Sequence, residues 1–147
     1  MTEDEVVATA IQLATTYHAG QVDKSGRPYL GHCERVANMV NSSGGGWHQV
    51  AAAWLHDIVE DTTMTFDVLE KIMPGTVVQT VRLLTHENGV ANEDYWGAIA
   101  ENRFATLVKV CDIYDNLDPR RMCYLDEDKQ KRLRAKYGRA LQVLAGA

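Results

Sequence analysis

The sequence of 147 residues predicts an all-α fold in one domain. Apolar residues recur at three- and four-residue spacing through most of the chain, which is the spacing of one face of an α-helix. No alternation of apolar and polar residues, the pattern of a half-buried strand, persists beyond a few residues. Breaks rich in glycine and proline divide the chain into about eight helices. One compact core fits this length and two ordinary domains do not, so we expect a single domain over residues 1–147.

The first half of the chain contains three predicted helices. An apolar stripe predicts a helix over residues 6–17, and turn-forming residues predict a structured loop over 20–28. A second helix is predicted over 32–40. The glycine run 44–46 indicates a flexible connector that lacks the preceding strand of a phosphate-binding loop. A third helix is predicted over 47–59.

The second half contains the remaining helices, the first two of which are separated by a Pro-Gly pair at 74–75. We predict them over residues 65–72, 77–84, 92–100, 103–117 and 127–144. The last is amphipathic, and its apolar stripe fits either a face of the core or the interface of a homo-oligomer.

Composition excludes several classes of function. The formal net charge of −5 argues against a nucleic-acid groove, because such a groove requires a broad basic face. No apolar run approaches the length that spans a bilayer, and the acidic N-terminus is unlike a secretory signal. We therefore expect a cytoplasmic protein that binds neither nucleic acid nor a membrane.

The three cysteines indicate neither a disulfide framework nor a zinc site. Cys33, Cys111 and Cys123 are far apart, odd in number and without CxxC spacing. We expect all three to fill core positions as small apolar residues.

A histidine and three carboxylates occur together directly after the apolar run 50–55. They are His56, Asp57, Glu60 and Asp61. Such groups are costly to bury on a helix unless a cation neutralises them. A metal ion is the expected partner.

Two further polar residues lie in apolar surroundings and are candidates for the same site. His32 follows a Pro-Tyr-Leu segment, and Asp112 lies within the mostly apolar segment 104–114. Imidazole nitrogens combined with carboxylate oxygens suit borderline divalent ions such as Mn, Fe, Co or Zn. The candidate metal ligands are therefore His32, His56, Asp57 and Asp112.

Helix geometry constrains how these residues act. Adjacent His56 and Asp57 diverge by about 100° on a helix, so both reach one ion only if it lies near the crest between them. Glu60 and Asp61 lie one turn further, where a carboxylate can orient or deprotonate a water. A solvated helix end is the alternative, although acidic residues at a helix C-terminus oppose its dipole.

Other polar residues carry weaker signals. Asp115 and Asn116 share the helix face of Asp112, and the sequence leaves open whether Asn116 caps the helix or contacts a ligand. The remaining histidines are expected to be hydrogen-bonded structural residues or simply exposed. These are His18, His48 and His86.

Three motifs resemble the HD metal-dependent phosphohydrolase superfamily and, more narrowly, the hydrolase domain of the RelA/SpoT alarmone enzymes. They are Gly20-Gln21-x-x-Lys24-Ser25-Gly26-x-Pro28-Tyr29-x-x-His32, Leu55-His56-Asp57-x-x-Glu60-Asp61-Thr62 and Leu107-Val108-Lys109-x-x-Asp112-x-x-x-Asn116. The motifs occur in the family's order and span most of the chain. Because the sequence has no room for a synthetase domain, it looks most like a small alarmone hydrolase.

This resemblance implies an HD-type helical bundle that uses Mn2+ to remove the 3′-pyrophosphate of ppGpp or pppGpp, giving GDP or GTP and pyrophosphate. It implies that Mn2+ is bound by His32, His56, Asp57 and Asp112. Glu60 and Asp61 would position and activate the attacking water. The residues matched to the nucleotide pocket are Lys24, Ser25, Tyr29 and Asn116. Lys109 matches a lysine that is expected to be structural.

Two departures from the family pattern bear on the substrate. Asp23 and Asp118 stand where the family usually has arginine, which changes the local charge by about four units and disfavours a highly anionic ligand. Arg27, Arg120 or Arg121 would have to compensate. Two alternatives therefore stay open. One is a phosphohydrolase acting on a less charged nucleotide, such as a nucleoside monophosphate or the 2′-phosphate of NADPH. The other is a non-catalytic, metal-stabilised nucleotide-binding module.

Overall fold

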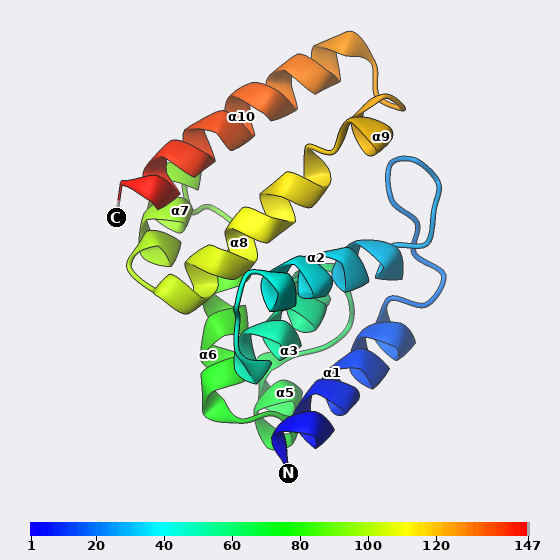
Figure 1. Cartoon of the computed structure of the whole chain (residues 1–147), viewed down its shortest axis with the longest axis vertical. Helices are drawn as coiled ribbons and strands as arrows, with labels where there is room; N and C mark the ends of the chain where they lie inside the picture. The colour runs from blue at the N-terminus through cyan, green and yellow to red at the C-terminus, as the bar shows by residue number, and fades with distance from the viewer. Residues whose placement is uncertain (147) are drawn as a thin grey trace.

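The computed structural model describes residues 1–146, and its regular elements are helices (Figure 1). They are α1 (Glu3–Tyr17), α2 (Leu30–Ser42), α3 (Trp47–Leu55), α4 (Ile58–Asp61), α5 (Phe66–Ile72), α6 (Gly75–Leu84), α7 (Asn92–Ala100), α8 (Arg103–Asn116), α9 (Pro119–Met122) and α10 (Glu127–Ala145). Extended pairing in this part of the chain is limited to one isolated bridge between Val22 and Pro28. The predicted all-α fold class is confirmed. The single domain over 1–147 stays a prediction, and its last residue lies outside the described residues.

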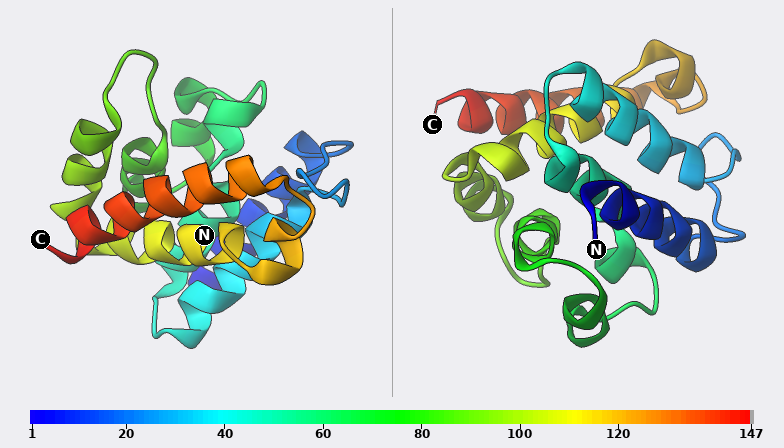
Figure 2. Two further views of the ribbon diagram at one scale, coloured as in Figure 1. Left: turned by 90° about the horizontal axis from the view of Figure 1, so that it is seen from above. Right: turned by 60° about the horizontal axis from the view of Figure 1, so that its bottom comes forward.

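Helix α3 lies at the centre of the bundle and packs against α1, α2, α6 and α8. Its residues Ala51, Ala52 and Ala53 are fully buried. Small side chains let the neighbouring helices approach closely, which explains the apolar run at this point of the sequence. Helix α10 lies along α7 and α8 on the outside of the bundle (Figure 2).

The predicted helix over 47–59 is wrong in one respect, because it is broken at His56 and Asp57. Helix α3 ends at Leu55, and α4 begins at Ile58. Asp57 has φ −106° and ψ 2°, outside the helical region. On a regular helix the side chains of His56 and Asp57 would point about 100° apart. The break frees the two side chains from that geometry.

Helix α9 was not predicted. Asp118 accepts a hydrogen bond from the Arg120 amide at 2.9 Å, and Pro119 occupies the first helical position. An aspartate followed by proline is a recognised helix start, so the sequence did contain a signal for this helix.

The turn between α2 and α3 is close-packed, unlike the flexible connector expected there. Gly45 donates its amide to the Val40 carbonyl at 2.9 Å. A Cβ at Gly45 would lie 2.6 Å from Val40 Cγ1 and 3.2 Å from Leu107 Cδ2. The glycine is therefore required by the close approach of two helices.

The loop between α1 and α2 is structured, as predicted. The Asp23 amide donates to the Arg27 carbonyl at 2.8 Å, and the Tyr29 amide donates to the Gln21 carbonyl at 2.9 Å. Asp23 Oδ1 also accepts hydrogen bonds from the amides of Ser25 and Arg27. These bonds fix the segment that leads into α2.

Two of the three cysteines fill core positions as expected. Cys33 and Cys111 are buried, but Cys123 is exposed. Cys123 directly follows the short helix α9, at the surface. None of the helices within residues 1–146 is long and apolar enough to cross a membrane.

Candidate metal centre and active site

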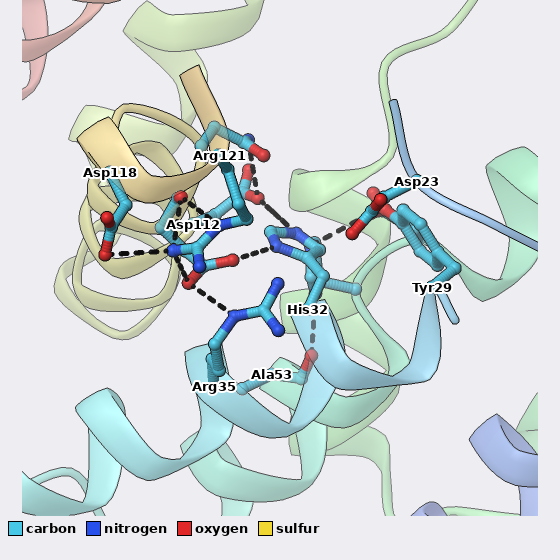
Figure 3. A network of polar contacts seen from close by, with 12 residues as sticks. Asp23, Tyr29, His32, Arg35, Ala53, Asp112, Asp118 and Arg121 are labelled. Carbon is cyan, nitrogen blue, oxygen red and sulfur yellow. Dashed lines mark hydrogen bonds and ion pairs between the residues drawn. The ribbon is translucent and has the colours of Figure 1, made fainter. Parts of the chain in front are cut away.

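Three parts of the bundle bring the four predicted metal ligands together. His32 lies on α2, Asp112 on α8, and His56 with Asp57 in the break after α3. Asp112 Oδ1 lies 2.9 Å from His32 Nε2 and 3.3 Å from His56 Nε2. Asp57 Oδ2 lies 3.0 Å from His56 Nε2. Ligand atoms of His32, His56 and Asp57 lie within 4.8 Å of one another, and Asp112 lies against both imidazoles. Figure 3 shows His32 and Asp112 facing each other.

Both imidazoles are oriented through their second nitrogen. His56 Nδ1 lies 2.6 Å from the Ala53 carbonyl, which can only accept, so Nδ1 carries the proton in the neutral ring. His32 Nδ1 lies 2.7 Å from Asp115 Oδ2. In the neutral rings, each Nε2 is thereby left as a lone pair toward the centre of the site. Carboxylates and carbonyls hold metal-binding histidines in the same way.

The environment of His56 Nε2 fits a cation. This atom is buried and has no hydrogen-bond partner within residues 1–146, although two carboxylates lie close to it. Burial lowers the pKa of His56, but Asp57 and Asp112 outweigh burial and raise the pKa well above its ordinary value. A lone pair facing two carboxylates is repulsive unless a proton or a metal ion lies between them. The donor set of two imidazoles and two carboxylates suits a divalent ion.

Neighbouring side chains hold the two carboxylates. Lys109 Nζ lies 3.0 Å from Asp112 Oδ2, and Asn116 Nδ2 lies 3.2 Å from Asp112 Oδ1. The Tyr29 hydroxyl donates to Asp57 Oδ2. Burial raises the pKa of Asp112, but Lys109 and His56 outweigh it and hold the pKa well below the usual range. Asp112 is therefore a carboxylate.

Glu60 and Asp61 lie on α4 beside the metal centre. Ligand atoms of Asp57, Glu60 and Asp61 all lie within 4.8 Å of one another. Burial, followed by the charges of Asp57 and Glu60, raises the pKa of Asp61 to about 6. A carboxylate with this pKa is suited to accept a proton near neutral pH. Glu60 Oε1 accepts a hydrogen bond from the His86 amide at 2.7 Å, which fixes its position.

A cavity of about 370 Å³, here called the acidic cavity, opens over the metal centre. Its acidic wall contains Asp57, Glu60, Asp61 and Asp112. Its basic groups are Lys24, Lys109 and Lys136. Acidic and basic groups in one cavity suit a metal ion together with an anionic ligand.

A second cavity of about 290 Å³, here called the arginine cavity, lies on the other side of His32. Arg35 and Arg121 line it, together with Val22, Asp23, Leu125, Leu133 and other residues. Lys24, Tyr29, Asn116 and Tyr137 line both cavities. The two cavities therefore adjoin, and one elongated ligand can extend from one to the other.

The four residues predicted to bind substrate all lie at these cavities. Lys24, Tyr29 and Asn116 line both, and Ser25 lines the arginine cavity. Tyr29 has a further contact through its hydroxyl with Asp57, so it also touches the metal centre. Sequence reasoning placed these residues only through the family motifs.

Arg35 was missed by sequence reasoning. Arg35 Nε donates to Asp115 Oδ1 at 2.9 Å, and Arg121 Nη2 donates to the same oxygen at 2.6 Å. Asp115 therefore links His32 to both arginines. The position of Arg35, three residues after His32 on one helix face, was the only available signal.

The three arginines expected to offset Asp23 and Asp118 differ in position. Arg121 lines the arginine cavity, whereas Arg27 lines neither cavity. Arg120 pairs with Asp118 at 2.8 Å on the surface. Arg121 and the unpredicted Arg35 are therefore the arginines that line the arginine cavity.

Sequence reasoning also missed the wall formed by the loop after α6. His86 Nε2 donates to the Val90 carbonyl at 2.6 Å, and its ring stacks on Tyr95 with 4.3 Å between centroids. Both residues line the acidic cavity. His86 is hydrogen-bonded as expected, but no spacing in the sequence placed it at the site.

Comparisons with known proteins agree with this geometry. The family model described as "HD domain" matches residues 10–113. The zebrafish (Danio rerio) guanosine-3′,5′-bis(diphosphate) 3′-pyrophosphohydrolase MESH1 is 29% identical, covering 96% of this chain and 83% of that protein. A solved structure described as a metazoan orthologue of SpoT that hydrolyses ppGpp has a TM-score of 0.81 and 24% identity. It covers 96% of this chain and 86% of its own. This structural likeness supports the fold.

Other relatives are much longer than this chain. A probable guanosine-3′,5′-bis(diphosphate) 3′-pyrophosphohydrolase of Synechocystis is 29% identical over 87% of this chain, which spans 18% of the relative's length. The bifunctional (p)ppGpp synthase/hydrolase SpoT of Escherichia coli is 30% identical over 68% of this chain, which spans 14% of that protein. The family match over residues 10–113 shows that the chain belongs to the HD-domain family, and α2, the α3–α4 break and α8 contribute the histidines and aspartates of its candidate site.

Proposed function

We propose that this chain is a metal-dependent hydrolase that removes the 3′-pyrophosphate of guanosine (p)ppGpp. Water adds to the phosphorus next to O3′ and the P–O3′ bond breaks. The products are GDP or GTP, with a proton on the 3′ oxygen, and pyrophosphate. The names of the zebrafish and Synechocystis relatives support this substrate.

The observation that carries the proposal is the unsatisfied Nε2 of His56. Its Nδ1 is bonded to the Ala53 carbonyl, and its Nε2 faces Asp57 and Asp112 without a hydrogen bond. A proton or a metal ion must lie between these groups, and a cavity with basic residues that opens above them gives a metal ion access. This arrangement suits a phosphate ester, because phosphoryl oxygens bind both metal ions and ammonium groups.

Each group in the acidic cavity has a distinct part in this reaction. The metal would be held by His32, His56, Asp57 and Asp112, and when bound it polarises the phosphoryl group and lowers the pKa of water. Asp61, with a pKa of about 6, accepts the proton from the attacking water. Glu60, held by the His86 amide, orients that water.

We further propose Mn2+ as the metal, because the resemblance to the RelA/SpoT hydrolase domain implies it; the mixed nitrogen and oxygen ligands by themselves suit Mn, Fe, Co or Zn. Lys24 and Lys136 balance the charge of the phosphates from the walls of the cavity. A cytoplasmic location and assembly into a homo-oligomer stay predictions.

A second candidate function is hydrolysis of a less charged nucleotide, such as a nucleoside monophosphate or the 2′-phosphate of NADPH. Asp23 in the wall of the arginine cavity favours it, because a carboxylate repels phosphate. Arg35 and Arg121 in the same cavity oppose it. A non-catalytic module is the weaker alternative, because a structural metal site would have no use for Glu60 and Asp61.

The test is hydrolysis of ppGpp by the purified protein with Mn2+, with the products separated by ion-exchange chromatography. Wild type should release GDP and pyrophosphate in equal amounts, and Asp57→Ala should release neither. Asp67→Asn, a change on α5 at a residue that lines neither cavity, serves as the control and should retain activity. Hydrolysis of a nucleoside monophosphate or NADPH in place of ppGpp would favour the second candidate.

A further inference from the structure

Gln21 belongs to the first of the three family motifs, but the proposed reaction leaves it without a part. Its side chain lies between a buried histidine and the helix that carries Glu60 and Asp61. Gln21 Nε2 donates to the backbone carbonyl of Asp61 at 2.8 Å. Gln21 Oε1 lies 2.7 Å from His18 Nδ1. Gln21 thereby links the loop after α1 to α4, across 40 positions of the sequence.

The direction of both hydrogen bonds follows from the chemistry of the groups. The Asp61 carbonyl can only accept, so the Gln21 atom that faces it is the amide nitrogen. The amide oxygen therefore faces His18, and His18 Nδ1 carries the proton that it donates. A rotated Gln21 amide would place its oxygen against the carbonyl oxygen of Asp61. His18 thus holds the Gln21 amide in the orientation that binds Asp61.

The loop around Gln21 is itself held in place. His18 is buried, and its ring lies against Tyr29 with 5.1 Å between centroids. The Gln21 amide donates to the His18 carbonyl at 3.0 Å, and the Gln21 carbonyl accepts from the Tyr29 amide at 2.9 Å. Gly20 has φ 82°, which glycine adopts without strain, so the chain can turn between His18 and Gln21. His18 and Gln21 therefore form a fixed support.

Helix α4 is an element that requires such support. It is a single turn, and isolated turns of helix are marginal without tertiary contacts. Ile58 anchors its first residue in the core, whereas Glu60 and Asp61 at its other end are exposed. The His86 amide holds the Glu60 side chain at 2.7 Å. Gln21 holds the backbone of Asp61, the last residue of the helix.

We propose that Gln21, oriented by His18, is a positioning residue for Asp61. By holding the Asp61 backbone, Gln21 sets where the Asp61 carboxylate lies relative to the metal centre. This inference rests on the proposed function, in which Asp61 accepts a proton from the attacking water. Proton transfer requires heavy atoms about 2.6–3.2 Å apart, so a shift of Asp61 by about 1 Å slows the reaction. Gln21 lines neither cavity, so it acts through Asp61 and not on the substrate.

The first test is Gln21→Met, which keeps the length of the side chain and removes the amide. We expect kcat for ppGpp to fall roughly tenfold to a hundredfold. KM, and the affinity for Mn2+ measured by electron paramagnetic resonance, should stay within about twofold of wild type, because the groups that bind them are unchanged. A kcat within about twofold of wild type, or an equal loss in KM and metal affinity, would overturn the inference.

Thr106→Val is the matched control. Thr106 Oγ1 donates to the Ile99 carbonyl at 2.9 Å, so this variant also loses one bond from a side chain to a distant backbone carbonyl. Thr106 lines neither cavity. Thr106→Val should lower the melting temperature about as much as Gln21→Met and leave kcat unchanged. An equal fall of kcat in both variants would show a general loss of stability and overturn the inference.

Two replacements of nearly the same shape test the part of His18. In His18→Asn the side-chain amide can still donate to Gln21 Oε1 from near the position of Nδ1, whereas His18→Leu has no donor. Burial favours leucine, so a general effect on stability would favour His18→Leu. We expect the opposite order in kcat, with His18→Asn faster by roughly threefold to tenfold. Equal kcat values, or a faster His18→Leu, would overturn the orienting role of His18.

Failure of the proposed function is a separate outcome. If wild type hydrolyses no 3′-diphosphate, the proposed function is wrong, and amide hydrogen exchange decides the support of α4 alone. The amides of Asp61 and Thr62 close this turn, with bonds of 2.9 and 3.2 Å to carbonyls four residues earlier. Their exchange should be about tenfold faster in Gln21→Met, and the control variant should match wild type. Equal exchange in Gln21→Met and wild type would overturn the inference.

Discussion

Asp115 shows how a residue outside the metal ligands shapes the site. Its carboxylate is buried, accepts from His32 Nδ1 on one oxygen, and binds Arg35 and Arg121 with the other. Burial raises the pKa of Asp115, but the hydrogen bonds from His32 and Arg35 outweigh it and lower the pKa. Asp115 therefore orients an imidazole and anchors two arginines at once.

Replacing Asp115 should weaken metal binding without removing a ligand. In Asp115→Asn the side chain can no longer accept from His32 and from both arginines as an anion. We expect the affinity for Mn2+, measured by electron paramagnetic resonance, to fall about 10- to 100-fold. Asp118→Asn, which pairs with Arg121 but does not touch His32, is the control. Equal affinities for the two variants would contradict this role.

The sequence revealed the histidines and acidic residues of the candidate site but not all of their partners. His56 and Asp57 were predictable because they interrupt an apolar run, and Asp112 because it is an acid among apolar neighbours. Asp115 was placed on the face of Asp112, but its partner His32 is 83 residues away. Such pairing depends on how α2 and α8 pack, which periodicity does not reveal.

At the level of helices, the break between α3 and α4 matters most for function. A regular helix over 47–59 would separate the directions of His56 and Asp57. The break at these two residues instead brings atoms of both side chains within 3.0 Å of each other. Helix periodicity predicted the existence of the longer helices well, and it failed where the site imposes a local departure from regular geometry.

The turn between α2 and α3 provides a test of helix packing. A Cβ at Gly45 would collide with Val40 Cγ1 at 2.6 Å and lie 2.9 Å from the Val40 carbonyl oxygen. We expect Gly45→Ala to destabilise the fold by about 1–3 kcal/mol, measured by urea unfolding.

Gly97→Ala is the control for this experiment. Gly97 lies within α7, and its Cβ would meet nothing within 4 Å. Alanine there should stabilise the fold by about 0.5–1 kcal/mol. A destabilisation of similar size in both variants would show that the turn is not close-packed in solution.

For the whole molecule, the metal centre lies where helices far apart in the sequence meet. His32 and Asp112 come from α2 and α8, which pack against each other and against α3. A metal bound there links these helices in the folded state only. Metal binding should therefore stabilise the entire fold.

Thermal unfolding with and without Mn2+ measures this linkage. At an Mn2+ concentration of about 100 times Kd, the expected stabilisation is about 2.7 kcal/mol. For a chain of this size, that corresponds to a rise in Tm of about 5–10 °C. Asp57→Ala should show little or no rise. A wild-type Tm that does not respond to Mn2+ would contradict a metal site in the core of the bundle.

The position of the bound ion is the most direct test of the account. Crystals grown with Mn2+ and measured with X-rays near the manganese absorption edge would locate it by anomalous scattering. We predict one strong peak among His32, His56, Asp57 and Asp112. A peak among Asp57, Glu60 and Asp61 alone, or no peak in the bundle, would contradict the account.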